Sequence, residues 1–157
     1  MKLSDQVKAI RTALATWAKE QGGTVEVAGD AAHAFSLLYA SPGALRVAIW
    51  PNEETAAGTR PEGGRATRKF LVVLSRGRSL ALEKSDSLLS YVAGAQPLFD
   101  LVEDARDLVR GIEFTEGDES AALEYAGWQP LQIPSERILD AYQLTFTLEA
   151  QLPEPTT

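Results

Sequence analysis

The feature that most constrains the fold is a strict alternation of apolar and polar side chains over residues 142–152. A period of two is typical of a β-strand with one buried side and one side in water. A single strand is not stable alone, so the rest of the chain must supply partners for a sheet. The apolar members of the pattern are Tyr142, Leu144, Phe146, Leu148, Ala150 and Leu152.

Length and composition favour one globular domain. The 157 residues are 45% hydrophobic, and folding at this size buries roughly 70% of the surface of the unfolded chain. No run of about 18 apolar residues exists, and residues 1–21 are charged and amphipathic, so we expect neither a membrane span nor secretion. The chain has no cysteine and one histidine, His33, which excludes disulfides, thiolate metal sites and His-rich zinc sites.

The charges are distributed unevenly along the chain. Residues 1–82 carry 11 Lys and Arg against 7 Asp and Glu, or +4, whereas residues 83–157 carry 4 against 15, or −11. One interpretation is ordinary solvated faces. The other is that opposite surfaces pair head to tail with a second copy of the chain.

The N-terminal third contains one clear helix and one ambiguous segment. Residues 3–21 place apolar side chains at spacings of three and four, which predicts an amphipathic helix. Ser4 is its candidate N-cap, and Gly22 followed by Gly23 is its candidate stop. Residues 30–40 fit either a second helix, capped by Asp30, or a buried connector.

Residues 97–111 carry the strongest helical pattern of the chain. Apolar side chains line one face, and acidic side chains crowd the N-terminal half, where the helix dipole favours them. Pro97 suits the first helical turn, Arg110 lies in the last turn, and Gly111 supplies the stop.

Two strands are expected to form a hairpin. Residues 44–50 alternate, and residues 67–75 contain a continuous apolar run typical of a strand covered on both faces. Residues 52–65 between them hold three glycines and no large apolar side chain, so we expect a long exposed loop that is a candidate for partner contact. Residues 79–92 indicate an irregular crossing with a short helical turn.

The remaining segments complete the sheet. Residues 24–28 fit a short strand, and residues 112–121 are acidic and loop-like. Residues 123–133 indicate a strand that Gly127 and Pro130 interrupt, as expected at a sheet edge or a bulge. The terminal strand can pair with this segment.

The order of elements predicts an α+β fold in a single domain. We expect a mainly antiparallel sheet of about four strands, with two main helices over its apolar face. The domain spans residues 1–152 with the exposed loop at 52–65, and residues 153–157 form a short flexible tail.

No constellation favours catalysis. Four carboxylates on the helix over residues 97–111 lie opposite its apolar stripe, which indicates a solvated face rather than a metal or acid–base site. His33 has no nucleophile motif beside it, and the glycines of residues 58–64 lack the Lys-Ser/Thr of a phosphate-binding loop. We therefore expect no enzyme, no cofactor and no metal. The four carboxylates belong to Asp100, Glu103, Asp104 and Asp107.

Basic side chains gather along the predicted hairpin and its loop. Nucleic-acid binding would require them on one surface with a recognisable module, and none is visible. A solvated flank or a protein interface is the favoured interpretation. The set comprises Arg60, Arg65, Arg68, Lys69, Arg76 and Arg78.

As a whole, the sequence resembles the tail terminator proteins of long-tailed bacteriophages, including those with contractile, Mu-like tails. The resemblance covers nearly the full chain, although residues 52–65 and 83–96 have no string that aligns. It rests on the N-terminal helix, the strand over residues 44–50, and the strings FLVVLSRGR (70–78), PLFDLVEDARDLVRG (97–111) and DAYQLTFTLEAQL (140–152).

The resemblance implies a structural role in the virion, in the neck region of the tail, after assembly in the host cytoplasm. Proteins of this family form a hexameric ring on the head-proximal end of the tail tube, stop its polymerisation and join the head. The implied partners are further copies of the chain, the tail tube protein, the head–tail connector (stopper) protein and, in a contractile tail, the sheath protein. DNA passes through the lumen without being read, and no membrane is involved.

Five residues are candidates for contact with neighbouring subunits: Trp50, Arg60, Arg65, Arg68 and Lys69. Aromatic and arginine side chains dominate interface energetics, although Trp50 also fits a core position. Replacing Arg65 and Arg68 by Glu is expected to abolish docking of the ring while the monomer stays folded. The competing functions are another neck, head-completion or tail tube protein, or a cytosolic module that binds a small molecule in an apolar pocket.

Overall fold

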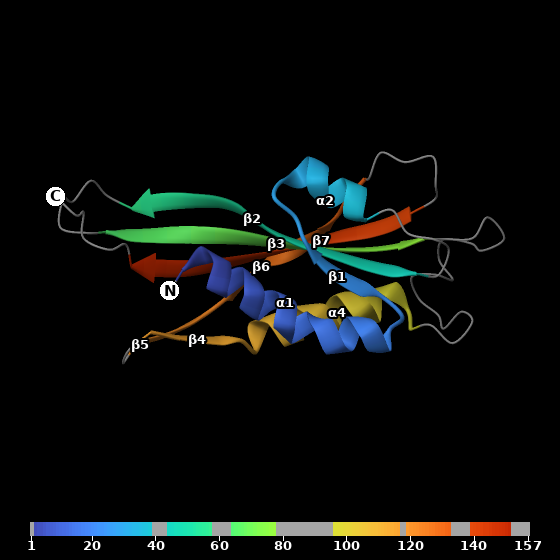
Figure 1. Cartoon of the computed structure of the whole chain (residues 1–157), viewed down its shortest axis with the longest axis horizontal. Helices are drawn as coiled ribbons and strands as arrows, with labels where there is room; N and C mark the ends of the chain where they lie inside the picture. Colours follow the sequence, from blue (N-terminus) through green and yellow to red (C-terminus); the bar gives the residue numbers. More distant parts are fainter. Residues whose placement is uncertain are drawn as a thin grey trace.

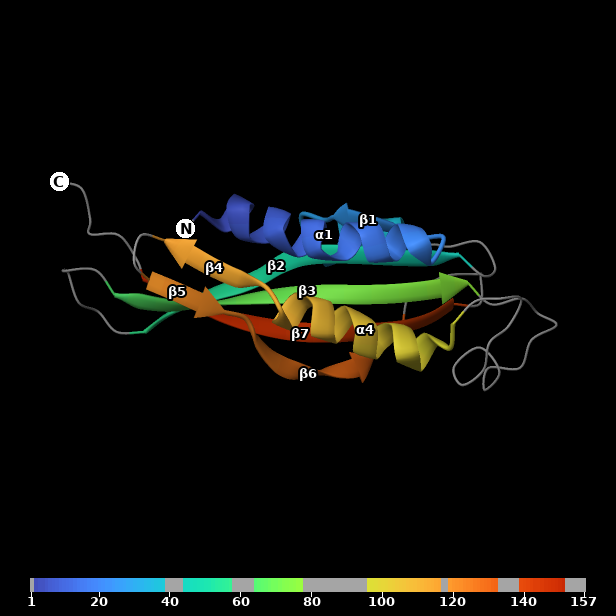
Figure 2. The same ribbon diagram turned by 90° about the horizontal axis from the view of Figure 1, so that it is seen from below.

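The fold is a five-stranded sheet with helices on both faces (Figures 1 and 2). This computed structural model describes residues 2–38, 44–57, 64–77, 96–116, 119–132 and 139–151. The sheet has the order β1-β2-β3-β7-β6. Its strands are β1 (Thr24–Val27), β2 (Leu45–Ala57), β3 (Arg65–Gly77), β7 (Leu139–Gln151) and β6 (Glu124–Pro130).

The pairing within the sheet is mostly antiparallel. β3 pairs with β2 on one side and along its whole length with β7 on the other, and β7 pairs with β6 as the sequence predicts. The expectation of about four strands omitted the parallel pairing of the short β1 with β2. β1 is too short to show the alternation of apolar and polar residues that is typical of a strand. A helix lies between β1 and β2 in the chain, and a connection of this kind allows the two strands to run parallel.

Two helices cover one face of the sheet. α1 (Leu3–Glu20) lies over the β1–β2 side and α4 (Leu98–Arg110) over the β7–β6 side (Figure 2). Both were expected from the spacing of their apolar residues. The larger core fills the space between these helices and the sheet. Its most deeply buried side chains include Ile10, Leu14, Leu45, Phe70, Leu98, Leu144 and Phe146.

A third helix covers part of the opposite face. α2 (Ala31–Leu37) packs on β2, above a smaller core that contains Trp50, Leu71 and Val73. The carboxylate of Asp30 accepts a hydrogen bond from the backbone amide of His33 at 2.8 Å, so the helical alternative for this segment is correct over residues 31–37.

The ends of the two long helices differ partly from expectation. Lys2 is the N-cap of α1 and makes no side-chain cap bond, so the assignment of Ser4 is wrong: Ser4 is already inside the helix. Pro97 is likewise the N-cap of α4 rather than a residue of its first turn. The predicted stop of α1 is correct, because Gly22 adopts a φ of 72° and its amide bonds back to the carbonyl of Lys19 at 3.0 Å.

The predicted loop at residues 52–65 is wrong in part. β2 continues to Ala57 and β3 begins at Arg65, with a register shift between Pro51 and Glu53. The sequence gives no apolar signal there because residues 52–56 are exposed; backbone pairing and charged cross-strand neighbours extend the strands instead. We refer to residues 53–57, 65–69 and 147–151 together as the distal arm.

A small hairpin replaces the loop expected at residues 112–121. β4 (Glu113–Glu116) pairs with β5 (Glu119–Ala122), and Phe114 is buried against the larger core. One buried aromatic in a run of acidic residues is too weak a pattern to indicate strands. The crossing expected at residues 79–92 and the tail at 153–157 lie outside the described residues.

Candidate functional site

The residues selected from the sequence occupy different environments. Trp50 is only 3% exposed and belongs to the core beneath α2, so it offers no surface for a neighbour in this conformation. Arg60 lies outside the described residues. The other three cations, Arg65, Arg68 and Lys69, lie on the distal arm.

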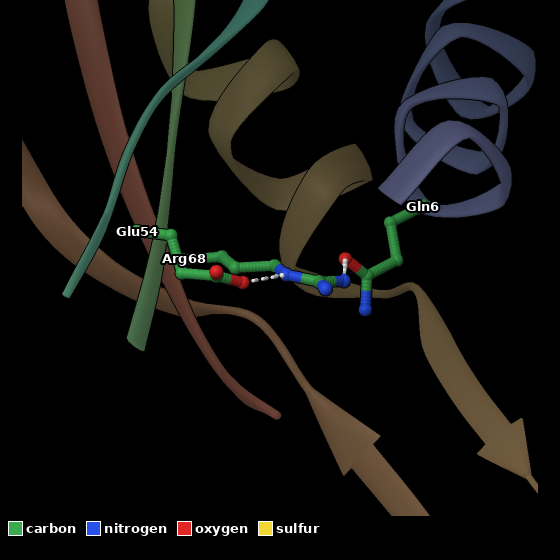
Figure 3. A network of polar contacts seen from close by, with 3 residues as sticks. All are labelled: Gln6, Glu54 and Arg68. Carbon is green, nitrogen blue, oxygen red and sulfur yellow. Dashed lines mark hydrogen bonds and ion pairs between the residues drawn. The ribbon is translucent and has the colours of Figure 1, made fainter. Parts of the chain in front are cut away.

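Arg68 joins three elements (Figure 3). Its Nε donates to Glu54 Oε1 on β2 at 2.7 Å, and its Nη1 donates to Gln6 Oε1 on α1 at 2.9 Å. The Arg68 side chain is 17% exposed, and Gln6 is buried. Arg68 therefore connects the distal arm to α1, and its guanidinium group is used in contacts within the subunit.

Arg65 and Lys69 lie on the opposite face of β3. Arg65 is 77% exposed, and its Nη1 lies 3.6 Å from Glu149 Oε2 on β7. Lys69 Nζ lies 2.9 Å from Glu53 Oε1 on β2. Each candidate cation on the described part of the arm therefore has a carboxylate neighbour, and this region is charge-balanced rather than basic.

A fourth cation of the basic set is buried. Arg76, near the end of β3, donates from Nη1 to the carbonyl oxygen of Gln96 at 2.6 Å. Burial lowers the pKa of Arg76, and the charge of Asp140, its register partner on β7, raises it. This group supports the packing of the segment before α4 and is not a contact surface.

The acidic side chains of α4 make separate contacts. Asp104 Oδ2 accepts a hydrogen bond of 3.4 Å from Trp17 Nε1, and Asp107 Oδ1 accepts one of 2.8 Å from Arg106 Nε. The latter bond lowers the pKa of Asp107. Within the described ranges, no group of three or more His, Asp or Glu side chains is arranged to hold a metal ion.

His33 has a local structural role. Its Nδ1 accepts a hydrogen bond from the backbone amide of Gly29 at 3.0 Å, and its own amide donates to Asp30. These contacts shape the start of α2.

The sequence did not reveal a groove between α4 and the edge strand β6. Its cavity measures about 250 Å³. Two of its aromatic walls are open to solvent, with Trp128 54% and Phe99 37% exposed. The groove is lined by Phe99, Val102, Glu103 and Arg106 of α4, Tyr125 and Trp128 of β6, and Tyr142 of β7.

Three aromatic rings in the groove are arranged edge to face. The centroid of the Tyr142 ring lies 5.6 Å from that of Phe99, with the planes at 78°, and 5.6 Å from that of Trp128, at 71°. Tyr125 packs on Phe146 at 5.5 Å. These distances and angles are favourable for aromatic pairs, so Tyr142 forms a base between two aromatic walls.

A β-bulge creates this arrangement. Tyr125 pairs with Phe146 but Trp128 pairs with Leu144, so three steps on β6 match two on β7. Side chains three residues apart on a regular strand point to opposite faces, and the extra residue brings both aromatic rings to the α4 side. Gly127 adopts the φ of 122° that the bulge requires.

Two features make the groove amphipathic. The hydroxyl of Tyr125 is buried, and it has no hydrogen-bond partner among the residues that the structure describes. Burial raises the pKa of Tyr125, against the lowering effect of Arg106, so the hydroxyl stays protonated at neutral pH and can donate. Arg106 and Glu103 bring charges of both signs to the lining.

The sequence predicted an edge position or a bulge for this segment, and the described strand has both. The groove itself was missed because its lining comes from three elements, and the odd spacing of Tyr125 and Trp128 does not look like one face of a strand. A glycine between two aromatic residues in an edge strand was the available signal.

A scan of the sequence against protein-family models and a search among curated proteins found no match. Among the described helices, none combines the length and the apolar character needed to cross a membrane.

Proposed function

We propose that this protein is a structural virion component that forms a hexameric ring on the head-proximal end of a phage tail tube. The proposal is supported by the positions, in the fold, of the sequence segments that resemble tail terminator proteins. They fall on α1, β2, β3, α4 and β7, which pack on one another: both helices share one face of the sheet, and Trp17 of α1 donates to Asp104 of α4. The resemblance therefore covers a single packed unit.

The surfaces of the molecule also support self-assembly. The distal arm and the groove lie on different parts of the molecule, and the groove exposes aromatic side chains of the kind that anchor interfaces. Contacts between two unlike surfaces of identical subunits are heterologous, and they produce a ring when the rotation closes.

In this proposal the protein acts by its shape. One face of the ring docks on the last ring of the tube protein, and the other face lacks a surface to which a further tube subunit could add. The head–tail connector protein, and the sheath protein in a contractile tail, would then bind the completed ring. DNA passes through its lumen.

The test is the native mass of the purified chain over a wide concentration range, combined with negative-stain images and a tube-length assay. We expect closed rings of six subunits that never elongate, and tail tubes that stop growing when the protein is added. Long tubes formed by this chain alone would identify a tube protein instead.

The structure changes how the arm should be tested. Arg68 holds β2, β3 and α1 together, so replacing it by Glu would set two carboxylates side by side and perturb the monomer. Arg65 and Lys69 are the better positions for charge reversal, because both lie on the solvent side of β3.

The groove also favours a second function, a module that binds a small molecule. Its volume is just below the range of about 300–1,000 Å³ that is usual for such sites, and it combines aromatic walls with the Tyr125 hydroxyl and two charged side chains. This alternative predicts a persistent monomer or dimer, together with saturable binding of an aromatic or apolar compound. A ring that caps tubes without any such ligand would exclude it.

A further inference from the structure

The side chains that line the groove between α4 and β6 indicate which chemical groups it can bind. Three rings, those of Phe99, Trp128 and Tyr142, form a flat-walled aromatic site that is open to solvent. Proline rings pack well on such walls, and proline-rich segments are recognised in grooves of this kind. A buried tyrosine hydroxyl with a proton to donate suits a backbone carbonyl, which a chain in the polyproline conformation leaves free.

The charges along the groove are balanced within α4. Phe99, Glu103, Arg106 and Arg110 follow one another at spacings of four, three and four residues, and therefore form one stripe on α4. This stripe contains two cations and one carboxylate, and Arg106 also donates to Asp107 at 2.8 and 3.3 Å, so the groove does not select its occupant by charge.

The chain itself contains a segment with this chemistry. Residues 152–157 read LPEPTT, with Glu154 between Pro153 and Pro155. The described strand that precedes them, β7, ends at Gln151.

This segment cannot fill the aromatic site of its own subunit. Tyr142 lies nine positions before Gln151 on β7, a distance of about 30 Å along an extended strand. Pro155 lies four residues beyond Gln151 and can extend at most about 14 Å from it. If residues 152–157 fill this site, they must therefore come from another copy.

We propose that the groove between α4 and β6 of one copy binds residues 152–157 of a second copy. Pro153 and Pro155 pack against Trp128, Tyr142 and Phe99, and a backbone carbonyl accepts from the Tyr125 hydroxyl. Donor segment and groove are unlike surfaces, so the contact is heterologous and propagates from copy to copy until a ring closes. This inference deepens the proposed ring function and rests on it.

Binding is tested with a peptide of residues 150–157, AQLPEPTT. The receptor is the full chain with Pro153→Ser and Pro155→Ser, so that its own segment does not compete. The readout is the tryptophan emission, because Trp128 is the most exposed of the chain's three tryptophans. We expect a saturable blue shift, with at least tenfold weaker binding by the same peptide carrying serine in place of both prolines.

Two controls make the binding test specific. Phe99→Ser in the same receptor removes a wall of the groove but keeps the Trp128 reporter, and it should abolish the response, whereas Trp17→Phe should preserve it. Absence of saturable binding, equal binding of the serine peptide, or displacement by a peptide of residues 57–66, which join β2 to β3 in the sequence, would each overturn the proposal.

Assembly of the full chain provides the second readout. Pro153→Ser with Pro155→Ser, and separately Trp128→Ser, should raise the concentration at which oligomers form by at least tenfold. Rings that persist unchanged in both variants would overturn this inference and leave the ring function intact. If the peptide binds to the groove but the native chain never forms rings, the groove assignment stands and the proposed function fails.

Discussion

The central part of the long strands and the distal arm belong to the same three strands but are stabilised differently. In the centre, α1 and α4 cover one face of β2, β3 and β7, and α2 packs over β2 and the adjoining part of β3 on the other face. Side chains such as Val72, Val73 and Leu74 are therefore buried on both sides of the sheet. Burial of apolar surface on two faces is the main source of stability there.

The distal arm continues the backbone pairing without that cover. On its outer face, charged side chains pair across the strands, Arg65 with Glu149 and Lys69 with Glu53. On its inner face, Arg68 makes the polar contact to α1. The hydrogen-bonded pairing of the strands is therefore continuous, whereas the interactions that stabilise it change from apolar burial in the centre to polar contacts in the arm. We infer that the centre determines the fold and that the arm is available for contacts with other molecules.

The largest expected effect is in the centre. Phe146→Ala removes a fully buried ring that is the register partner of Phe70 and packs on Tyr125. A change of this kind leaves a cavity, so the free energy of unfolding should fall by about 3–5 kcal/mol. Urea denaturation monitored by circular dichroism measures it.

The matched control is the next residue of the same strand. Thr147 faces the opposite side of β7, where it is only partly buried, and Thr147→Ala should change the free energy of unfolding by less than about 1 kcal/mol. Equal losses for the two variants would mean that the strand is not packed on one apolar face as described.

An intermediate effect is expected where the arm meets α1. Arg68→Ala leaves the buried Gln6 amide and the Glu54 carboxylate without the contacts in Figure 3. Loss of two hydrogen bonds, one of them to a carboxylate, should reduce the free energy of unfolding by about 1–3 kcal/mol. A double-mutant cycle with Gln6→Ala measures how much of this loss belongs to the pair. If the losses of stability in Arg68→Ala and Gln6→Ala were simply additive, the interaction energy between Arg68 and Gln6 would be zero.

The difference between these regions also explains what could be predicted from the sequence. The helices over residues 3–20 and 98–110 and the terminal strand each bury a regular apolar stripe, which the sequence shows as a period. The central part of the β2–β3 hairpin was predictable from its apolar residues. The distal arm and the β4–β5 hairpin carry mostly polar side chains. Their strands form through backbone pairing with neighbouring strands, which the local sequence pattern does not indicate.

The candidate site was less predictable for a related reason. Individual basic residues could be selected, but whether each has a partner depends on cross-strand neighbours such as Glu53 and Glu149, which are set by register. The groove depends on a bulge that turns Tyr125 and Trp128 to the same side. Register and bulges are properties of strand pairs, so a single sequence indicates them only weakly.

The smallest effect is expected at the exposed surface of the arm. Arg65→Glu replaces a cation that is 77% exposed and lies 3.6 Å from an equally accessible carboxylate. Exposed ion pairs contribute little, so the free energy of unfolding should stay within about 1 kcal/mol of the wild type. Arg65→Gln, which removes the charge without reversing it, is the matched control. If Arg65→Glu cost as much as Arg68→Ala, the outer face of the arm would be an energetic part of the core, and the contrast between the two regions would fail. If stability holds while rings are lost, the arm is a surface for contact between subunits, as the charge pattern of the sequence first suggested.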